Sequence, residues 1–222
     1  MLRPLIRFLS VLALLFCLSA PAEAQRVHRI GFSVGTAAPI GDFKRDRFED
    51  DYPPLARTGA NWQLNYRTDL KPYLAIGATT GFRSHRFDIE TFAGPDDGLV
   101  LRKEASGWRS AHLLGDVYLQ STPNILFGYL KGSLGVSYNQ APEVLVETRF
   151  GPVRRSSDTA LAPVYGIASG FGVQDGRFLL SFEIGVLRTR PEFDIQDAKG
   201  ASTTVNQDMH FLSYSMGLSY TL

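Results

Sequence analysis

Eight segments in which apolar and polar side chains alternate are the feature of this sequence that most restricts its fold. Alternation with a period of two predicts β-strands, and about ten residues are enough for a tilted strand to cross a membrane. After residue 24, no segment approaches 18 consecutive apolar residues, so the sequence predicts no helical span. The predicted strands are 27–37, 59–67, 73–87, 107–120, 125–139, 159–173, 177–189 and 209–222.

The connections between these segments alternate strictly between long and short. Three are short, at 68–72, 121–124 and 174–176, and they consist of turn-forming residues such as Asp175 and Gly176. Membrane barrels have short periplasmic turns and long extracellular loops. The sequence therefore predicts an all-β fold, an eight-stranded antiparallel up-and-down transmembrane β-barrel. Its four long loops are 38–58, 88–106, 140–158 and 190–208.

The size of the side chains indicates which face of the barrel points outward. The last strand carries Leu212, Tyr214 and Leu218 on one face and small residues such as Ser213 and Gly217 on the other. The interior of an eight-stranded barrel is just wide enough to be filled by side chains. We therefore expect the bulky apolar face to meet lipid and the small polar face to line the lumen. A soluble, lipocalin-like barrel with the faces reversed is the alternative.

The first 24 residues have the pattern of a cleaved secretory signal peptide. Arg3 and Arg7 precede an uncharged run at 8–20, which is too short for a membrane span, and small residues follow up to Ala24. We predict cleavage after Ala24, which leaves the barrel domain at 25–222. Cys17, the only cysteine of the chain, lies in the signal, so no disulfide is expected in the barrel. A lipoprotein anchored through Cys17 is a less favoured alternative, because bulky Phe16 precedes it.

The charge balance and the histidines argue against several functional classes. The 23 basic and 22 acidic residues give no basic excess of the kind that binds nucleic acid. No two histidines lie at the spacing of metal ligands. No nucleophile–base pair is apparent either, because parity places His210 on the lipid side and Ser213 and Ser215 on the lumen side. We predict no catalytic residue, metal site or cofactor. The other histidines are His28, His85 and His112.

Four charged residues fall on the inward face of the predicted strands. Asp116 and Lys131 are nearly symmetric about the short turn at 121–124, so we expect them to face each other across neighbouring strands. Unpaired charge in a narrow lumen is costly, which predicts a salt-bridge network that plugs the barrel. A gated ion pathway is the alternative. The predicted lumen charge network comprises Arg83, Asp116, Lys131 and Glu183.

Aromatic residues on the outward face cluster near the strand ends. Rings at both ends of a barrel mark the two membrane–water interfaces. The predicted girdle comprises Tyr66, Phe178 and Tyr220 near the short turns, and Phe82 and Tyr138 near the long loops.

Two long loops retain strand-like sequences, and one is strongly charged. Residues 99–101 and 144–146 are expected to extend strands above the membrane, where they pair with each other or offer an edge to a partner. The mixed charges of the first loop predict a solvated or lipopolysaccharide-facing loop, because the basic residues between the carboxylates disfavour a calcium site. These charges are Asp42, Lys44, Arg45, Asp46, Arg47, Glu49, Asp50 and Asp51.

The mature chain resembles the small outer-membrane β-barrel proteins, the OmpA/OmpX-like barrels of the porin family. The resemblance rests on GFSVG at 31–35, PIGDF at 39–43, the eight-strand plan and the C-terminal pattern Ser215-x-Gly217-x-x-Tyr220-x-Leu222. It implies that these four C-terminal residues form the signal read by the barrel assembly machinery. The family usually ends in an aromatic residue, and Leu222 departs from that pattern.

These patterns together predict an integral protein of the Gram-negative outer membrane with a structural or surface-interaction role. The expected partners are outer-membrane lipid and lipopolysaccharide, the barrel assembly machinery, and an extracellular partner that binds the long loops. A narrow porin-like pore, a lipid-modifying outer-membrane enzyme and a soluble lipocalin-like carrier stay open as alternatives.

Overall fold

The computed structural model describes residues 27–45, 53–94, 98–121, 125–196 and 200–222 of the 222-residue chain. The predicted signal peptide at 1–24 and its cleavage site lie outside the described residues, as do residues 46–52 of the charged first loop. The predicted division of the chain at residue 24 therefore stays a prediction.

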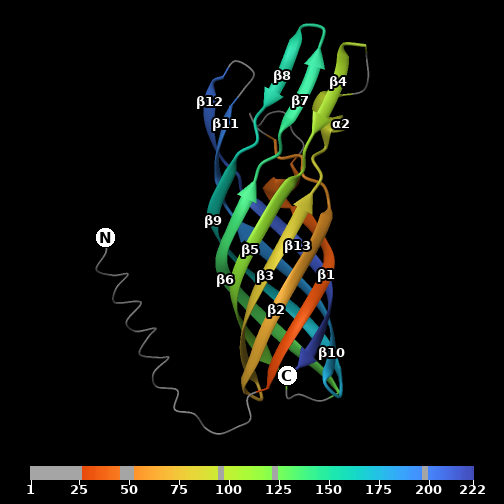
Figure 1. Cartoon of the computed structure of the whole chain (residues 1–222), viewed down its shortest axis with the longest axis vertical. Helices are drawn as coiled ribbons and strands as arrows, with labels where there is room; N and C mark the ends of the chain where they lie inside the picture. Colours follow the sequence, from red (N-terminus) through yellow and green to blue (C-terminus); the bar gives the residue numbers. More distant parts are fainter. Residues whose placement is uncertain (1–26, 46–52, 95–97, 122–124, 197–199) are drawn as a thin grey trace, which may run out of the picture.

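Eight antiparallel strands close into a barrel, which confirms the predicted fold class (Figure 1). Strands that follow each other around the wall also follow each other along the chain, and the last strand pairs with the first from Ile40↔His210 to Arg29↔Thr221. The short connections that follow Lys71 and Asp175 lie at one end of the barrel, where the C-terminus also lies (Figure 1), and residues 122–124 of the other predicted short connection lie outside the described residues. The barrel strands are β1 (His28–Ile40), β2 (Gly59–Lys71), β3 (Leu74–His85), β5 (Trp108–Gln120), β6 (Leu126–Gln140), β9 (Thr159–Asp175), β10 (Phe178–Thr189) and β13 (Met209–Thr221).

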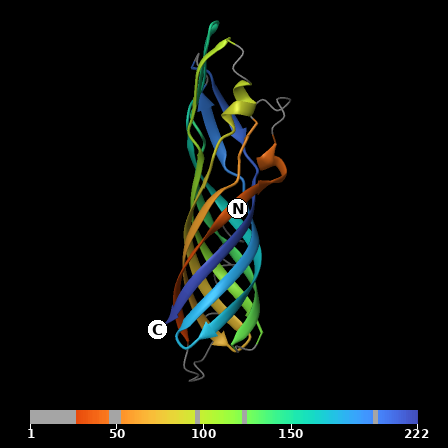
Figure 2. The same cartoon turned by 90° about the vertical axis from the view of Figure 1, so that its right-hand side faces the viewer.

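The long loops build a second layer of structure beyond the barrel end (Figures 1 and 2). β4 (Val100–Ala105), β7 (Val144–Thr148) and β8 (Gly151–Arg155) form a three-stranded sheet, and β11 (Glu192–Gln196) pairs with β12 (Ser202–Asn206). The second and third loops pair through β4 and β7 as expected, but in a shifted register, because residues 144–146 pair with 103–105 and Val100 pairs with Thr148. This projecting structure also includes the 3-10 turn η1 (Gly41–Lys44) and α2 (Ile89–Ala93).

The two helical elements are short. No helix in the described part of the chain is long and apolar enough to cross a membrane.

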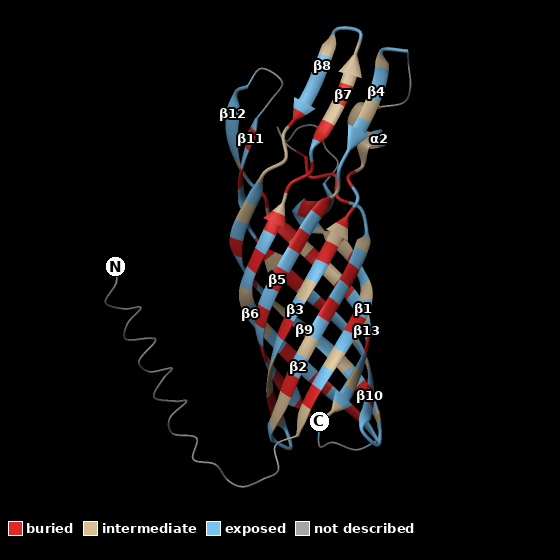
Figure 3. Cartoon of the chain, in the orientation of Figure 1, coloured by how far each residue is buried: buried red, intermediate tan, exposed pale blue. Residues whose placement is uncertain are grey.

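Burial alternates along the barrel strands, because successive side chains point to opposite faces of a sheet. β5 alternates without a break between buried and exposed residues from Trp108 to Gln120. Figure 3 shows the same alternation as red and pale blue bands around the wall. Large apolar side chains such as Leu130, Leu134 and Ile184 are exposed on the outside, while Lys131, Ser137 and Asn139 are buried in the lumen. The predicted assignment of the two faces is therefore confirmed.

The inward face is not polar throughout, which corrects the expectation of a lumen lined mainly by small polar residues. An apolar cluster, called here the mouth cluster, closes the lumen at the long-loop end around Phe43, Trp108, Phe193, Met209 and Phe211. Phe43 comes from η1 and Phe193 from β11, so the loops themselves supply part of this cluster. A second group near the short turns, called the base cluster, comprises Ala75, Tyr118, Phe127, Tyr129 and Leu179.

Two inward glycines make room for the rings of the base cluster. A β-carbon at Gly170 would lie 2.5 Å from the phenol ring of Tyr129, and one at Gly77 would lie 3.2 Å from the ring of Tyr118. Carbon atoms in van der Waals contact are about 3.5–4.0 Å apart, so a larger side chain at Gly170 would collide with the Tyr129 ring, and one at Gly77 would press on the Tyr118 ring and meet the carbonyl oxygen of Tyr66. The small residues of the inward face thus allow large rings from other strands to fill the lumen.

Candidate functional site in the barrel lumen

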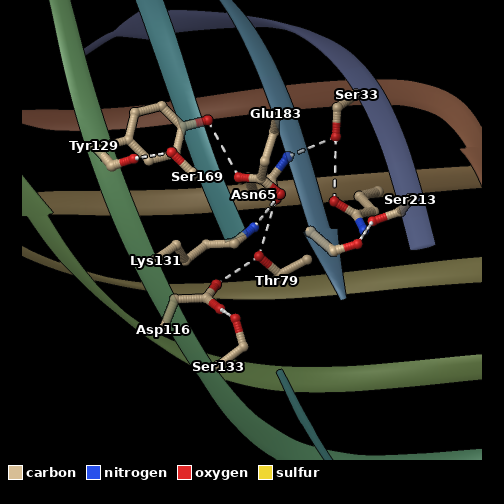
Figure 4. A network of polar contacts seen from close by, with 12 residues as sticks. Ser33, Asn65, Thr79, Asp116, Tyr129, Lys131, Ser133, Ser169, Glu183 and Ser213 are labelled. Carbon is tan, nitrogen blue, oxygen red and sulfur yellow. Dashed lines mark hydrogen bonds and ion pairs between the residues drawn. The ribbon is translucent and has the colours of Figure 1, made fainter. Parts of the chain in front are cut away.

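An ion pair lies at the centre of the lumen. The Nζ atom of Lys131 on β6 lies 2.5 Å from Oε1 of Glu183 on β10, and the hydroxyl of Tyr129 donates to Oε2 of Glu183 over 3.2 Å (Figure 4). Only 7% of the lysine side chain and 15% of the glutamate side chain are exposed. The pair is therefore largely withdrawn from solvent, and each partner compensates the charge of the other.

Asp116 is held by hydroxyl groups. Thr79 donates to its Oδ2 over 2.6 Å, and Ser133 donates to its Oδ1 over 2.5 Å (Figure 4). The expected face-to-face pairing of Asp116 with Lys131 is wrong, because the register pairs Asp116 with Ser133 and Lys131 with Tyr118. The long side chain of Lys131 reaches Glu183 on β10, and β9 lies between their two strands.

Hydrogen bonds continue from this layer around the lumen toward β1. Asn65 lies 2.9 Å from the Thr79 hydroxyl and donates to Ser33 over 3.1 Å, and Ser33 lies 3.4 Å from Gln63 (Figure 4). The Thr79 hydroxyl carries a single hydrogen, and its shorter contact directs that hydrogen to the Asp116 carboxylate. These contacts link β1, β2, β3, β5 and β6, and Glu183 of β10 lines the same small cavity as Ser33 and Asn65, so the two groups together form one polar layer across the lumen.

Arg83, the fourth predicted member of the charge network, lies apart from the Lys131–Glu183 ion pair. Its guanidinium lies over the ring of Phe211 at 4.5 Å, and its Nη2 lies 3.1 Å from Nδ1 of His112. Arg83 is 1% exposed and, among the described residues, forms no salt bridge. It points inward as predicted, but it lies nearer the long loops than Lys131 and contacts the edge of the mouth cluster.

A second charged group lies at the short-turn end and was missed by the sequence reasoning. Arg29 pairs with Asp69 at 2.6 Å, and Arg67 lies 3.3 Å from the same carboxylate and 4.7 Å from the centre of the Tyr118 ring. Arg29 shares its parity with Ser33, and Arg67 shares its parity with Gln63, so the alternation already placed both inward. Asp69 was assigned to a turn, whereas β2 continues through it to Lys71.

The space left between the base cluster and the polar layer is small. The cavity there has a volume of about 50 Å³ and is lined by Ser33, Asn65, Arg67, Tyr118 and Glu183, among other residues. A water molecule needs about 10–15 Å³ of such space, so the cavity holds a few waters at most. Along the lumen, the base cluster, the polar layer and the mouth cluster follow one another from the short turns to the long loops.

The predicted girdle residues all lie on the outer wall, with exposed fractions between 36% and 54%. Phe178 and Tyr220 pack edge to face at 5.4 Å on neighbouring strands. The predicted assembly-signal residues Ser215, Gly217 and Tyr220 lie in β13, and Leu222 follows that strand. The location of the girdle at a membrane interface and the recognition of the C-terminal signal stay predictions.

The histidines occupy four separate environments. His85 and His112 are buried in the lumen, His28 contacts the hydroxyl of Tyr66 at 2.8 Å, and His210 lies 3.0 Å from Asp208. Ser213 is buried and Ser215 lines the lumen cavity, whereas His210 lies among the outward residues of β13, so the wall separates it from both serines. Among the described residues, no group of three or more histidine, cysteine or carboxylate side chains is arranged to hold a metal ion.

One comparison with solved structures agrees with this fold. A search of protein-family models finds no match, and a search of curated proteins finds none either. Among solved structures, the chain is similar to a major outer membrane protein from Thermus thermophilus, with a TM-score of 0.54 and 13% identity over 90% of this chain and 100% of that one.

Two further structures are similar over comparable lengths. Neisserial surface protein A matches with a TM-score of 0.48 and 9% identity, covering 88% of this chain and 97% of that one. Ail, the attachment invasion locus protein of Yersinia pestis, matches with a TM-score of 0.47 and 10% identity, covering 89% of this chain and 97% of that one.

The closed barrel, its apolar outer wall and its filled lumen define an integral membrane β-barrel protein. Its structure has the OmpA/OmpX-like fold of the small eight-stranded outer-membrane barrels, and at 13% identity the similarity concerns the fold.

Proposed function

We propose that this protein is a non-enzymatic component of the outer membrane of a Gram-negative bacterium, with a lumen closed to solutes and with its activity in the structure above the barrel. It has a structural or surface-interaction role, and it enters the membrane through the barrel assembly machinery. The observation that carries the proposal is that the base cluster, the polar layer and the mouth cluster together fill the lumen from one end to the other.

The filling of the lumen supports a closed barrel. The mouth cluster places Trp108 and Phe211, both fully buried, across the long-loop end, and the ring centroid of Phe43 lies 5.3 Å from that of Trp108 and 5.1 Å from that of Phe211. Below it, the Lys131–Glu183 pair occupies the centre of the lumen. An ion would have to displace apolar rings and break a buried ion pair to pass, and both steps are costly.

The sheet above the barrel supports a surface-interaction role. β4 is an edge strand of the three-stranded sheet, and Leu99 and Leu101 beside or within it are 44% and 64% exposed. At the far end of the β7–β8 hairpin, Phe150 is 89% exposed. An exposed strand edge and a projecting aromatic side chain are typical means by which proteins capture an extended segment of a partner. We propose that the extracellular partner binds this layer.

The outer wall supports insertion in a membrane. Leu113, Leu134, Leu161 and Ile167 are each more than half exposed, and they lie on the three neighbouring strands β5, β6 and β9. Water would make so much exposed apolar surface unfavourable, whereas hydrocarbon accommodates it. This is the surface that we propose contacts outer-membrane lipid and lipopolysaccharide.

Conductance of the purified barrel in planar lipid bilayers tests the closed lumen. We expect no discrete channel openings, with insertion verified by vesicle flotation and by heat-dependent mobility in gels. A general porin in the same bilayers is the positive control. Openings that change their ion selectivity in a Lys131→Glu variant would establish a path through the lumen and would contradict the proposal.

A further inference from the structure

On β2 and β3, two rows of outward side chains near the long-loop end differ sharply in size, because Trp62 and Phe82 lie in one row and Ala60 and Ser84 in the other. The register aligns Val34, Trp62, Phe82 and Ala111 across β1, β2, β3 and β5, and the two aromatic residues are 53% and 45% exposed. One step closer to the loops, the row of neighbours is Thr36, Ala60, Ser84 and Arg109. The rings of Trp62 and Phe82, called here the aromatic shelf, therefore project from the wall. The small side chains of Ala60 and Ser84 leave a hollow on the side of the shelf that is nearer the long loops.

This hollow is a groove on the outer wall, with a volume of about 780 Å³. Drug-sized and cofactor-sized ligands occupy sites of about 300–1,000 Å³. Its lining combines hydroxyl groups with two guanidinium groups, and it includes Thr36, Thr58, Ser84, Arg86 and Arg109. We call it the rim groove. Hydroxyl and guanidinium donors together are the groups that bind phosphate oxygens.

The charge around the rim groove is positive. Arg57 is neutralised by Asp88 at 2.6 Å, but within the described part of the chain neither Arg86 nor Arg109 forms a salt bridge. Arg86 also lines an adjoining groove of about 540 Å³ together with Lys44, Arg57 and the Asp88 that pairs with Arg57, so three cations and one carboxylate line it. Two arginines without carboxylate partners therefore line the same groove above the aromatic shelf.

An apolar groove meets the rim groove on the same wall. It has a volume of about 430 Å³ and is lined by Val34, Ile184, Tyr214 and Met216, and it shares Gly35 and Thr36 with the rim groove. The apolar groove therefore leads into the rim groove, which is basic and rich in hydroxyl groups. This order matches that of a lipid whose acyl chains lie below a phosphorylated headgroup.

We propose that this face is a binding site for a phosphorylated glycolipid of the outer leaflet. Its phosphate group binds Arg86 and Arg109, its sugar rings rest on the Trp62–Phe82 shelf, and an acyl chain lies in the apolar groove. The proposal rests on the outer-membrane location proposed above. It adds a defined site to that location, which by itself requires only general contact with lipid.

Native mass spectrometry of the detergent-solubilised barrel with diphosphorylated lipid A tests the site. An arginine near an anionic membrane surface contributes a factor of about five in affinity, so we expect Arg86→Gln/Arg109→Gln to weaken binding roughly 25-fold. The matched control is Arg102→Gln/Arg154→Gln, which removes the same charge from two exposed arginines of the projecting sheet. A third variant, Ala60→Phe, fills the hollow without changing the charge and should also weaken binding.

The outcomes separate the specific site from simpler explanations. Wild-type affinity in both the arginine pair variant and Ala60→Phe would overturn the proposal, as would equal losses in the charge-matched control. Displacement of the lipid by millimolar inorganic phosphate alone would show that the groove takes free phosphate and would overturn the glycolipid assignment. Heat-dependent gel mobility and membrane fractionation, run on every variant, report separately whether the barrel is folded and located in the membrane.

Discussion

Replacement of Lys131 by methionine removes a buried charge with little change of side-chain volume. At the 2.5 Å separation of the Lys131 and Glu183 atoms, an effective dielectric constant of about 20 gives an attraction of roughly 6–7 kcal/mol. The variant loses this attraction and recovers only the cost of withdrawing the lysine from water, a few kcal/mol. We therefore expect the free energy of unfolding to fall by about 3 kcal/mol, the lower end of the range for breaking a buried pair.

Urea unfolding in lipid vesicles, followed by heat-dependent gel mobility, measures this loss. The matched control is Lys71→Met, which removes an exposed lysine at the short-turn end and should change stability by less than about 0.5 kcal/mol. The double variant Lys131→Met/Glu183→Gln removes both charges and keeps an acceptor for Tyr129, so most of the stability should return. An unchanged midpoint for Lys131→Met would refute the reasoning about the central ion pair.

Two further predictions concern packing and pH. Gly170→Val should destabilise the barrel by about 1–3 kcal/mol, because a β-carbon at this position meets the Tyr129 ring. The control is Gly132→Val, which should be neutral in the same unfolding assay, because a β-carbon there has no atom within 4 Å. Burial alone would raise the pKa of Asp88, but hydrogen bonds from Thr91 and Arg57 hold it below its usual value. The stabilisation of the α2 start by ionised Asp88 is therefore complete above its ordinary pKa and is lost as the pH falls through the lower folded pKa. The protection factor of the Thr91 amide in nanodiscs, which is its exchange rate relative to that of an unstructured peptide at the same pH, should stay high from pH 7 to 5 and fall below about pH 4; an unchanged protection factor at pH 7 in Asp88→Ala would contradict the cap.

The sequence alternation predicted the barrel because its physical cause is local. A period of two fixes which side chains share a face, and the lengths of the connections fix which strands are neighbours. Both follow from residues close together in the chain. The eight predicted strands therefore match the observed ones, and most predicted ends lie within a few residues of the observed ends, with the largest difference at the end of β2.

The pairings across the lumen were not predictable in the same way. Lys131 and Glu183 lie on strands that are not neighbours, so their contact depends on strand tilt and on the reach of the lysine side chain. The mouth cluster depends on loops as well as strands, because Phe43 and Phe193 lie outside the barrel strands. Arg29 and Arg67 are a different case, because their parity already placed them inward and the alternation alone was sufficient to find them.

The orientation of the barrel in the outer membrane is the central claim, and cysteine labelling of intact cells tests it most directly. Cys17 is the only native cysteine, so a Cys17→Ser background isolates an introduced thiol. Phe150, 89% exposed at the tip of the β7–β8 hairpin, and Arg177, in the short turn before β10, mark the two ends. A membrane-impermeant maleimide should label Phe150→Cys on intact Gram-negative cells and Arg177→Cys only after the outer membrane is permeabilised. Labelling of Arg177→Cys but not Phe150→Cys on intact cells, or of neither until lysis, would contradict the account.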